Sequence, residues 1–285
     1  MTTSLTQTVS SLLGQPVTDV SPLSGGCIGQ VYRVQLADGR PFVVKADDAS
    51  QPKLDIEGKM LQYLAEHSPL PVPQVIHNAP NLLIMIFLPG QSHFSAEAQH
   101  HAAELLAALH NVSAKTFGLE WDTLIGGLHQ PNSPTVSWLD FFAQHRLLYM
   151  AKEGARVGRL PKVFLPRVEK LAARLDRWLV EPERPSLIHG DVWTTNVLAQ
   201  NGRITGFIDP AIYYADPEIE LAFTTLFGTF GRPFFERYHQ LRPIRDGFFE
   251  ERRDLYNLYP LLVHVRLFGG SYVRSVDSTL SRFGC

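Results

Sequence analysis

The feature of this sequence that most restricts its fold is a change in character at Pro89-Gly90. Before this break, apolar and polar residues alternate with the two-residue period of β-strands. This pattern predicts strands over residues 17–23, 30–36 and 40–46, and the almost wholly apolar run 81–88 predicts a further strand that is buried on both faces. Leucines and a methionine at helical spacing predict a helix over residues 52–67. Residues 1–88 are therefore predicted to form a sheet-rich lobe with one helix.

Residues 89–285 have a different pattern, in which apolar residues recur at helical spacing. The predicted helices cover residues 95–110, 138–150, 164–179 and 256–268. One hairpin interrupts them over residues 197–208, with Asn201-Gly202 as a typical two-residue turn. A sheet-rich lobe followed by a mainly helical lobe is an α+β arrangement.

The composition excludes several classes of partner. The formal net charge of -2 gives no basic excess that would indicate nucleic acid or an anionic membrane. The N-terminus lacks a signal-peptide pattern, and no apolar run approaches the ~20 residues of a membrane span. Two cysteines, Cys27 and Cys285, form no disulfide framework. We therefore expect a cytoplasmic protein that binds neither nucleic acid nor membranes.

Reactive side chains follow the apolar residues 186–188, in the stretch His189 to Asn196 (HGDVWTTN). Most short connections consist of Gly, Pro, Asn, Asp and Ser, so this one is too rich in reactive groups to be only a turn. Another carboxylate, Asp209, directly follows the predicted hairpin. These positions indicate a site next to the hairpin.

Together with three upstream features, these residues match the needs of phosphoryl transfer. A loop with Gly25 and Gly26 would let backbone N–H groups approach phosphates. Lys45 would neutralise phosphate charge, and Glu57 would hold that lysine. Each feature alone has a plainer interpretation: a turn, a solvated strand end and an exposed helix face.

The remaining groups complete the chemistry. Asp191 would accept the proton of the attacking hydroxyl. Asn196 and Asp209 offer oxygen ligands of the kind that Mg²⁺ prefers. The residues therefore predict a triphosphate and Mg²⁺ as cofactors, and the family resemblance described next implies that the triphosphate is ATP.

At these residues the chain resembles the protein-kinase-like superfamily, in the small-molecule branch that carries H-G-D-x-x-x-x-N. More closely it resembles the fructosamine kinase (ketosamine-3-kinase) family. The matching stretches include QPN at 130–132, QHRL at 144–147, DPAIYYADPEIELA at 209–222 and LLVHVRLFGGSY at 261–272. The resemblance implies a two-lobed fold and ATP-dependent phosphorylation of the sugar O3 of a ketosamine. The substrate would be fructosamine or ribulosamine, free or on a protein lysine, and decomposition of the phosphoester would then free the amine.

The resemblance also implies individual roles. Met85, Ile86 and Leu88 would belong to the linker whose backbone meets adenine. His189 would order the catalytic loop, and Glu220 would brace it from the next helix.

Two residues are candidates for substrate contacts. Trp193 either packs against the hairpin or places its ring against the sugar or its cationic amine, a contact worth ~1 kcal/mol. Asp216 would pair with that amine. The family often has Gly where this chain has Thr195, which disfavours positive φ, so this departure concerns the shape of the loop.

Cys27 is either a small apolar filler or a redox-sensitive thiol in the phosphate loop. The protein is accordingly expected to be a monomer or a redox-sensitive dimer.

Three other functions remain open. One is a related kinase that acts on aminoglycosides or choline, which a substrate panel would distinguish. Another is a nucleotide-binding pseudokinase, whose signature would be loss of Lys45, Asp191 or Asp209. The third is a metal hydrolase that uses His189 and Asp191.

Overall fold

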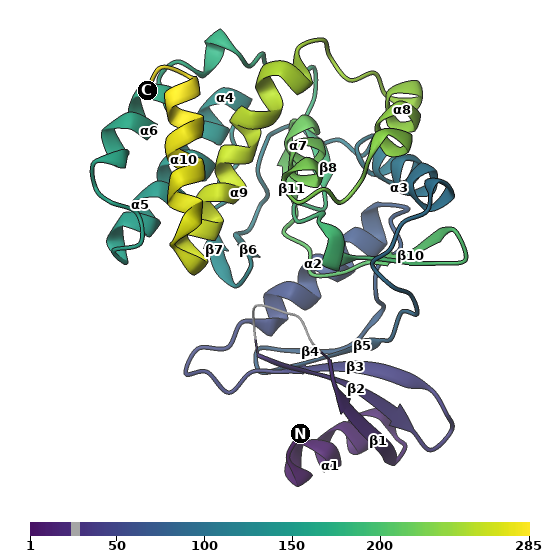
Figure 1. Cartoon of the computed structure of the whole chain (residues 1–285). Helices are drawn as coiled ribbons and strands as arrows, with labels where there is room; N and C mark the ends of the chain where they lie inside the picture. Colours follow the sequence, from purple (N-terminus) through teal and green to yellow (C-terminus); the bar gives the residue numbers. More distant parts are fainter. Residues whose placement is uncertain (24–28) are drawn as a thin grey trace.

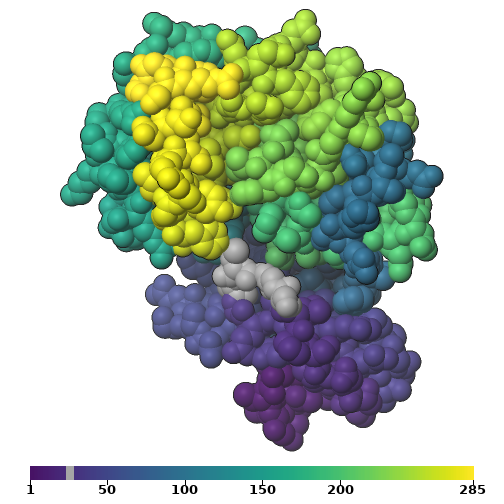
Figure 2. All heavy atoms as spheres, viewed as in Figure 1, coloured from purple at the N-terminus to yellow at the C-terminus, as the bar shows by residue number. Residues whose placement is uncertain are grey.

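The computed structural model describes residues 1–23 and 29–285, which form two lobes (Figures 1 and 2). The predicted α+β architecture is confirmed. The predictions for Gly25, Gly26 and Cys27 lie outside the described residues. None of the helices in the described ranges has both the length and the apolar character needed to cross a membrane.

A five-stranded antiparallel sheet in the order β1-β2-β3-β5-β4 forms the N-terminal lobe (Figure 1). Its strands are β1 (Val17–Pro22), β2 (Gln30–Leu36), β3 (Pro41–Ala46), β4 (Val75–Ala79) and β5 (Leu82–Ile86). Helix α1 (Thr3–Leu13) buries Val9 in an apolar cluster with residues of β2, β3 and β5. Helix α2 (Leu54–His67) packs against β5 through Leu54 and Leu61.

Helices dominate the C-terminal lobe. They are α3 (Ala96–Leu109), α4 (Trp138–Phe141), the π-helix η1 (Phe142–Leu148), α5 (Tyr149–Arg156), α6 (Phe164–Ala172), the 3₁₀ turn η2 (Leu175–Arg177), α7 (Glu218–Leu226), α8 (Arg232–Leu241), the π-helix η4 (Phe248–Arg252), α9 (Arg253–Phe268) and α10 (Ser271–Arg282). The helix predicted over 138–150 thus contains a π-helical stretch. The helix predicted over 164–179 ends early, at Ala172.

Three two-stranded sheets lie among these helices. They pair β6 (Thr123–Ile125) with β7 (Leu128–Gln130), β8 (Ser186–Ile188) with β11 (Tyr213–Ala215), and β9 (Val197–Gln200) with β10 (Arg203–Phe207). The 3₁₀ turn η3 (Thr194–Asn196) connects the catalytic stretch to β9. The hairpin predicted over 197–208 is therefore confirmed.

Helix α2 is shared between the lobes. Its Leu54 and Leu61 belong to the N-terminal core, whereas Met60 and Leu64 belong to the core of the C-terminal lobe. Because both faces of α2 are packed, its position relative to the two lobes is well defined.

Candidate active site

Lys45 and Glu57 form a buried ion pair in the N-terminal lobe. Lys45 lies near the end of β3, Glu57 lies in α2, and each residue is 6% exposed. The Lys45 Nζ is 2.6 Å from the Glu57 Oε1. The interpretations of Lys45 as a solvated strand end and of Glu57 as an exposed helix residue are therefore wrong.

Asp209 brings the C-terminal lobe to this pair. It follows β10 and has a positive φ of 53°, which is uncommon for a residue other than glycine. Its Oδ1 accepts a hydrogen bond from the Lys45 Nζ across 164 positions of sequence. One ammonium group thus joins two carboxylates from different lobes.

Asp191 and Asn196 are held together by the turn between them. The Asn196 Nδ2 donates to the Asp191 Oδ2 at 2.8 Å and to the Asp191 backbone O at 3.0 Å. Thr195 lies in the 3₁₀ turn η3 and does not have a positive φ. The loop therefore forms without the glycine that the family often has there.

The charge states of Lys45, Glu57 and Asp209 are determined by burial and by the nearby opposite charges. Burial opposes the charge of Lys45, but the carboxylates of Asp209 and Glu57 outweigh it and raise the pKa of Lys45. Burial raises the pKa of Glu57, although Lys45 opposes the shift. For Asp209, Lys45 outweighs burial and lowers the pKa. The site therefore offers a permanent cation beside an ionised carboxylate.

Asp191 has the electrostatics of a proton acceptor. Burial and then the negative charge of Asp209 raise the pKa of Asp191 to about 8, against the opposing hydrogen bond from Asn196. A general base is most effective when its pKa lies near the operating pH.

Glu220 in α7 braces the catalytic loop, residues 189–196, through two hydrogen bonds to the loop backbone. Its Oε1 accepts from the Gly190 N–H at 2.6 Å, and its Oε2 accepts from the His189 N–H at 3.3 Å. The His189 ring is fully buried, and burial lowers its pKa, so the ring is neutral. Its Nδ1 accepts from the Asp191 N–H at 3.4 Å, which is consistent with an ordering contact and not with a base.

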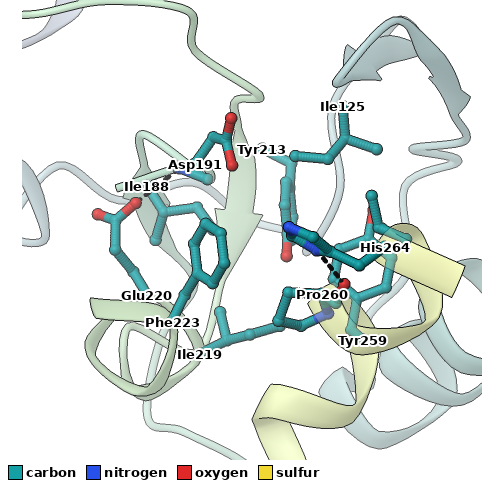
Figure 3. A pocket seen from close by; sticks show the side chains of 12 residues that line it. Ile125, Ile188, Asp191, Tyr213, Ile219, Glu220, Phe223, Tyr259, Pro260 and His264 are labelled. Carbon is teal, nitrogen blue, oxygen red and sulfur yellow. Dashed lines mark hydrogen bonds between the residues drawn. The ribbon is translucent and has the colours of Figure 1, made fainter. Parts of the chain in front are cut away.

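A pocket of about 390 Å³, open mouth included, lies beside Asp191 (Figure 3). Its walls are mostly aliphatic and aromatic side chains, as is usual for small-molecule sites. Figure 3 shows His264 facing it from α9, with its Nδ1 donating to the Pro260 carbonyl at 2.7 Å. Because burial lowers the pKa of His264, its neutral ring keeps Nε2 as an acceptor.

Most residues of this wall were not predicted as site residues from the sequence, among them Phe223, Tyr259 and His264. The available signal was a histidine inside the apolar stretch LLVHVRLF. An apolar helix face with one histidine is also typical of a core helix, so the pattern alone does not indicate a pocket.

Trp193 lies next to this pocket region. Its ring centroid is 5.7 Å from that of Phe227, and the Phe227 ring is 5.0 Å from His264. The aromatic partner of Trp193 is thus Phe227 at the end of α7, which is not part of the hairpin, and its contact with substrate remains a prediction.

The predicted contact between Asp216 and a substrate amine is wrong. Asp216 is 1% exposed. Its Oδ1 accepts from the Glu218 N–H at 2.9 Å, and its Oδ2 accepts from Arg245 and from the Tyr256 hydroxyl. The carboxylate stabilises the start of α7, is buried with both oxygens hydrogen-bonded inside the protein, and does not line the pocket.

The residues predicted to form the adenine-binding linker lie at the end of strand β5 and just after it. Met85 and Ile86 are the last residues of β5, and Leu88 follows in the connection to the C-terminal lobe. The Ile86 N–H donates to the Gln74 carbonyl at 2.9 Å. Ile86 therefore has no free N–H for adenine, and Leu88 is the better candidate for that donor.

The donor set beside Asp191 suits a hard cation. Asn196 uses its amide nitrogen on Asp191, and none of the described residues donates to its Oδ1. Together with the Asp209 carboxylate it offers oxygen ligands, which Mg²⁺ prefers and completes with phosphates or water. In the described ranges, no three His, Cys, Asp or Glu residues are grouped so as to hold a metal ion.

Known proteins resemble this chain over its whole length. A Synechocystis protein named a probable ketoamine kinase is 35% identical over 98% of this chain and 95% of its own. A chloroplastic protein-ribulosamine 3-kinase from Oryza sativa subsp. japonica is 30% identical over 94% of this chain and 79% of its own.

Solved structures of related proteins also resemble this chain over nearly its whole length. A Thermobifida fusca structure assigned as a fructosamine-3-kinase is 35% identical and covers 99% of this chain and 98% of its own, with a TM-score of 0.86. An aminoglycoside phosphotransferase structure, 19% identical over 99% of both chains with a TM-score of 0.67, shares the fold. The family model for fructosamine kinase matches residues 1–283. The chain is therefore a phosphotransferase with a protein-kinase-like fold, and it belongs to the fructosamine kinase family.

Proposed function

We propose that this kinase transfers the γ-phosphate of ATP to the sugar O3 of a fructosamine- or ribulosamine-type ketosamine. The substrate would be a small ketosamine or a glycated lysine of a protein. The resulting phosphoester would decompose and release the amine, so that the reaction reverses glycation.

The observation that carries this proposal is the position of Asp191. It lies at the pocket and, through Asn196 and Asp209, next to the buried Lys45 pair. An acceptor hydroxyl in the pocket would therefore meet a base on the side where the phosphates are expected. The apolar wall favours the carbon face of a sugar, and the His264 Nε2 offers one acceptor for a hydroxyl or ammonium.

The nucleotide would bind between Leu88 and the Lys45 pair. Lys45 would stabilise phosphate charge, with Glu57 fixing its position. Asn196 and Asp209 would hold Mg²⁺, which neutralises charge on the transferring phosphate. Asp191 would take the proton of the attacking hydroxyl.

ATP consumption with fructosamine, ribulosamine, choline and an aminoglycoside tests the proposal. We expect turnover with at least one ketosamine and a product phosphorylated at O3, identified by NMR. Turnover restricted to choline or the aminoglycoside would assign the chain another substrate class. ATP binding without turnover of any acceptor would support the pseudokinase alternative.

Replacing Trp193 with Ala is expected to raise KM for the ketosamine and to leave KM for ATP unchanged. The reason is that a cation–π or stacking contact of ~1 kcal/mol would be lost only on the acceptor side. Steady-state kinetics with each substrate varied in turn measure the difference. An unchanged ketosamine KM would assign Trp193 a packing role against Phe227 alone.

A further inference from the structure

A row of buried polar groups runs from α8 to the catalytic loop. The Tyr238 hydroxyl in α8 is 2.6 Å from the His110 Nδ1, just after α3. The His110 Nε2 is 2.8 Å from the Glu220 Oε2 in α7. Glu220 in turn accepts from the backbone of His189 and Gly190, directly before Asp191. Tyr238, His110 and Glu220 are each at most 2% exposed.

The donor and acceptor roles in this row follow when the Glu220 carboxylate is ionised and the His110 ring carries a single proton. An ionised carboxylate only accepts, so the His110 Nε2 carries the proton that it shares with Glu220. In the neutral ring the Nδ1 is then an acceptor, and the Tyr238 hydroxyl donates to it. Burial raises the pKa of Tyr238, so the hydroxyl keeps its proton. Every donor in the row meets an acceptor.

The loop at the end of this row has little freedom to move independently. Gly190 has a φ of 84°, and a Cβ placed on it would lie 2.1 Å from the Ala211 carbonyl oxygen. The Ala211 N–H donates to the His189 carbonyl at 2.7 Å. A shift of Glu220 would therefore be passed to the backbone that carries Asp191. A misplacement of about 1 Å in an active site can cost ~100-fold in rate.

We propose that Tyr238 and His110 are positioning residues for phosphoryl transfer. By fixing the tautomer and orientation of His110, the Tyr238 hydroxyl holds the Glu220 carboxylate under the His189–Gly190 backbone, and so places Asp191. This inference rests on the proposed function only for the acceptor used in the rate measurement. Neither Tyr238 nor His110 takes a chemical part in the reaction, and both act only by positioning Glu220.

Tyr238→Phe tests the row with the smallest change, because it removes only the hydroxyl. We expect kcat to fall about three- to tenfold, the effect of one lost hydrogen bond, with KM for ATP unchanged. Amide hydrogen exchange over residues 186–198 is expected to quicken. The control is Leu280→Val, at a fully buried position in α10 outside the row. It should lower Tm and leave kcat and loop exchange unchanged.

A second pair of variants tests His110. His110→Gln keeps a donor toward Glu220 and should retain most of kcat, whereas His110→Leu should lose roughly 10–100-fold. Full kcat and unchanged loop exchange in Tyr238→Phe would overturn the proposal, as would equal kcat in the Gln and Leu variants. If His110→Leu does not fold, Tyr238→Phe decides.

A different result would show that the proposed function, and not the positioning row, is wrong. A wild-type protein that phosphorylates no ketosamine would contradict that function. The exchange measurement needs no acceptor, so faster exchange in Tyr238→Phe than in Leu280→Val would still support the row, and equal exchange would refute it.

Discussion

An Asp191→Asn variant is expected to lose at least ~100-fold in kcat with its acceptor, because a carboxamide cannot take the proton of the attacking hydroxyl. The variant should keep its fold and its ATP affinity. The Asn196 amide still finds an oxygen at position 191, both on the backbone and on the new side chain. Single-turnover phosphate transfer and a nucleotide titration measure the two properties separately.

The pH dependence gives this prediction a second readout. Burial and Asp209 raise the pKa of Asp191 to about 8, and the base works in its deprotonated form. The wild-type kcat/KM should therefore rise with pH as Asp191 loses its proton, and Asp191→Asn should lack this rise.

Asp140→Asn, an exposed substitution in α4, is the matched control and should behave like the wild type. A wild-type rate in Asp191→Asn would show that Asp191 is not the base.

Elements with a local signal were predictable. Strand β2 spans the residues expected from its alternation, 30–36. Helix α3 begins after Ser95, whose hydroxyl accepts from the Ala98 N–H at 3.3 Å as a typical N-cap. The turn Asn201-Gly202 forms the tip of the hairpin, with both residues at positive φ. In each case residues close in sequence decide the structure.

Other elements depend on contacts that the sequence pattern does not contain. Helix α1 has few apolar residues, and only Val9 is buried, against the sheet. The π-helical stretch η1 carries the fully buried Arg146, whose guanidinium donates to Asn132 and to the Pro131 carbonyl and lies 3.8 Å from the Tyr213 ring centroid. Because the partners of Arg146 are more than ten positions away in the sequence, no periodic pattern of residues around Arg146 predicts the π-helical turn.

In the candidate site, too, local sequence signals were predictable and contacts between distant residues were not. The stretch 189–196 and the residue types of Lys45, Glu57 and Asp209 could be recognised in the sequence. That a single ammonium joins both carboxylates depends on how the lobes pack. The error at Asp216 has the same cause, because its partners Arg245 and Tyr256 are 29 and 40 positions away.

Replacing Lys45 with Met is expected to lower both activity and stability. Loss of a fixed cation at the phosphates should cost roughly 10²–10³ in kcat. The carboxylates of Glu57 and Asp209 would also lose their shared partner, and breaking a buried pair costs about 3–5 kcal/mol. Without Lys45 both pKa values would rise, because burial raises them and Lys45 would no longer oppose it. The stability deficit should therefore grow as the pH rises and the acids ionise, which denaturant unfolding at several pH values measures.

A double variant separates these two effects. Adding Glu57→Gln to Lys45→Met removes one of the uncompensated buried charges, so part of the lost unfolding free energy should return. The kcat should stay low, because neither substituent supplies a cation to the phosphates. Lys162→Met, at an exposed position, is the control for loss of a lysine and should change neither property. If the double variant recovered activity together with stability, Lys45 would act by holding the lobes together and not by stabilising charge on the phosphates.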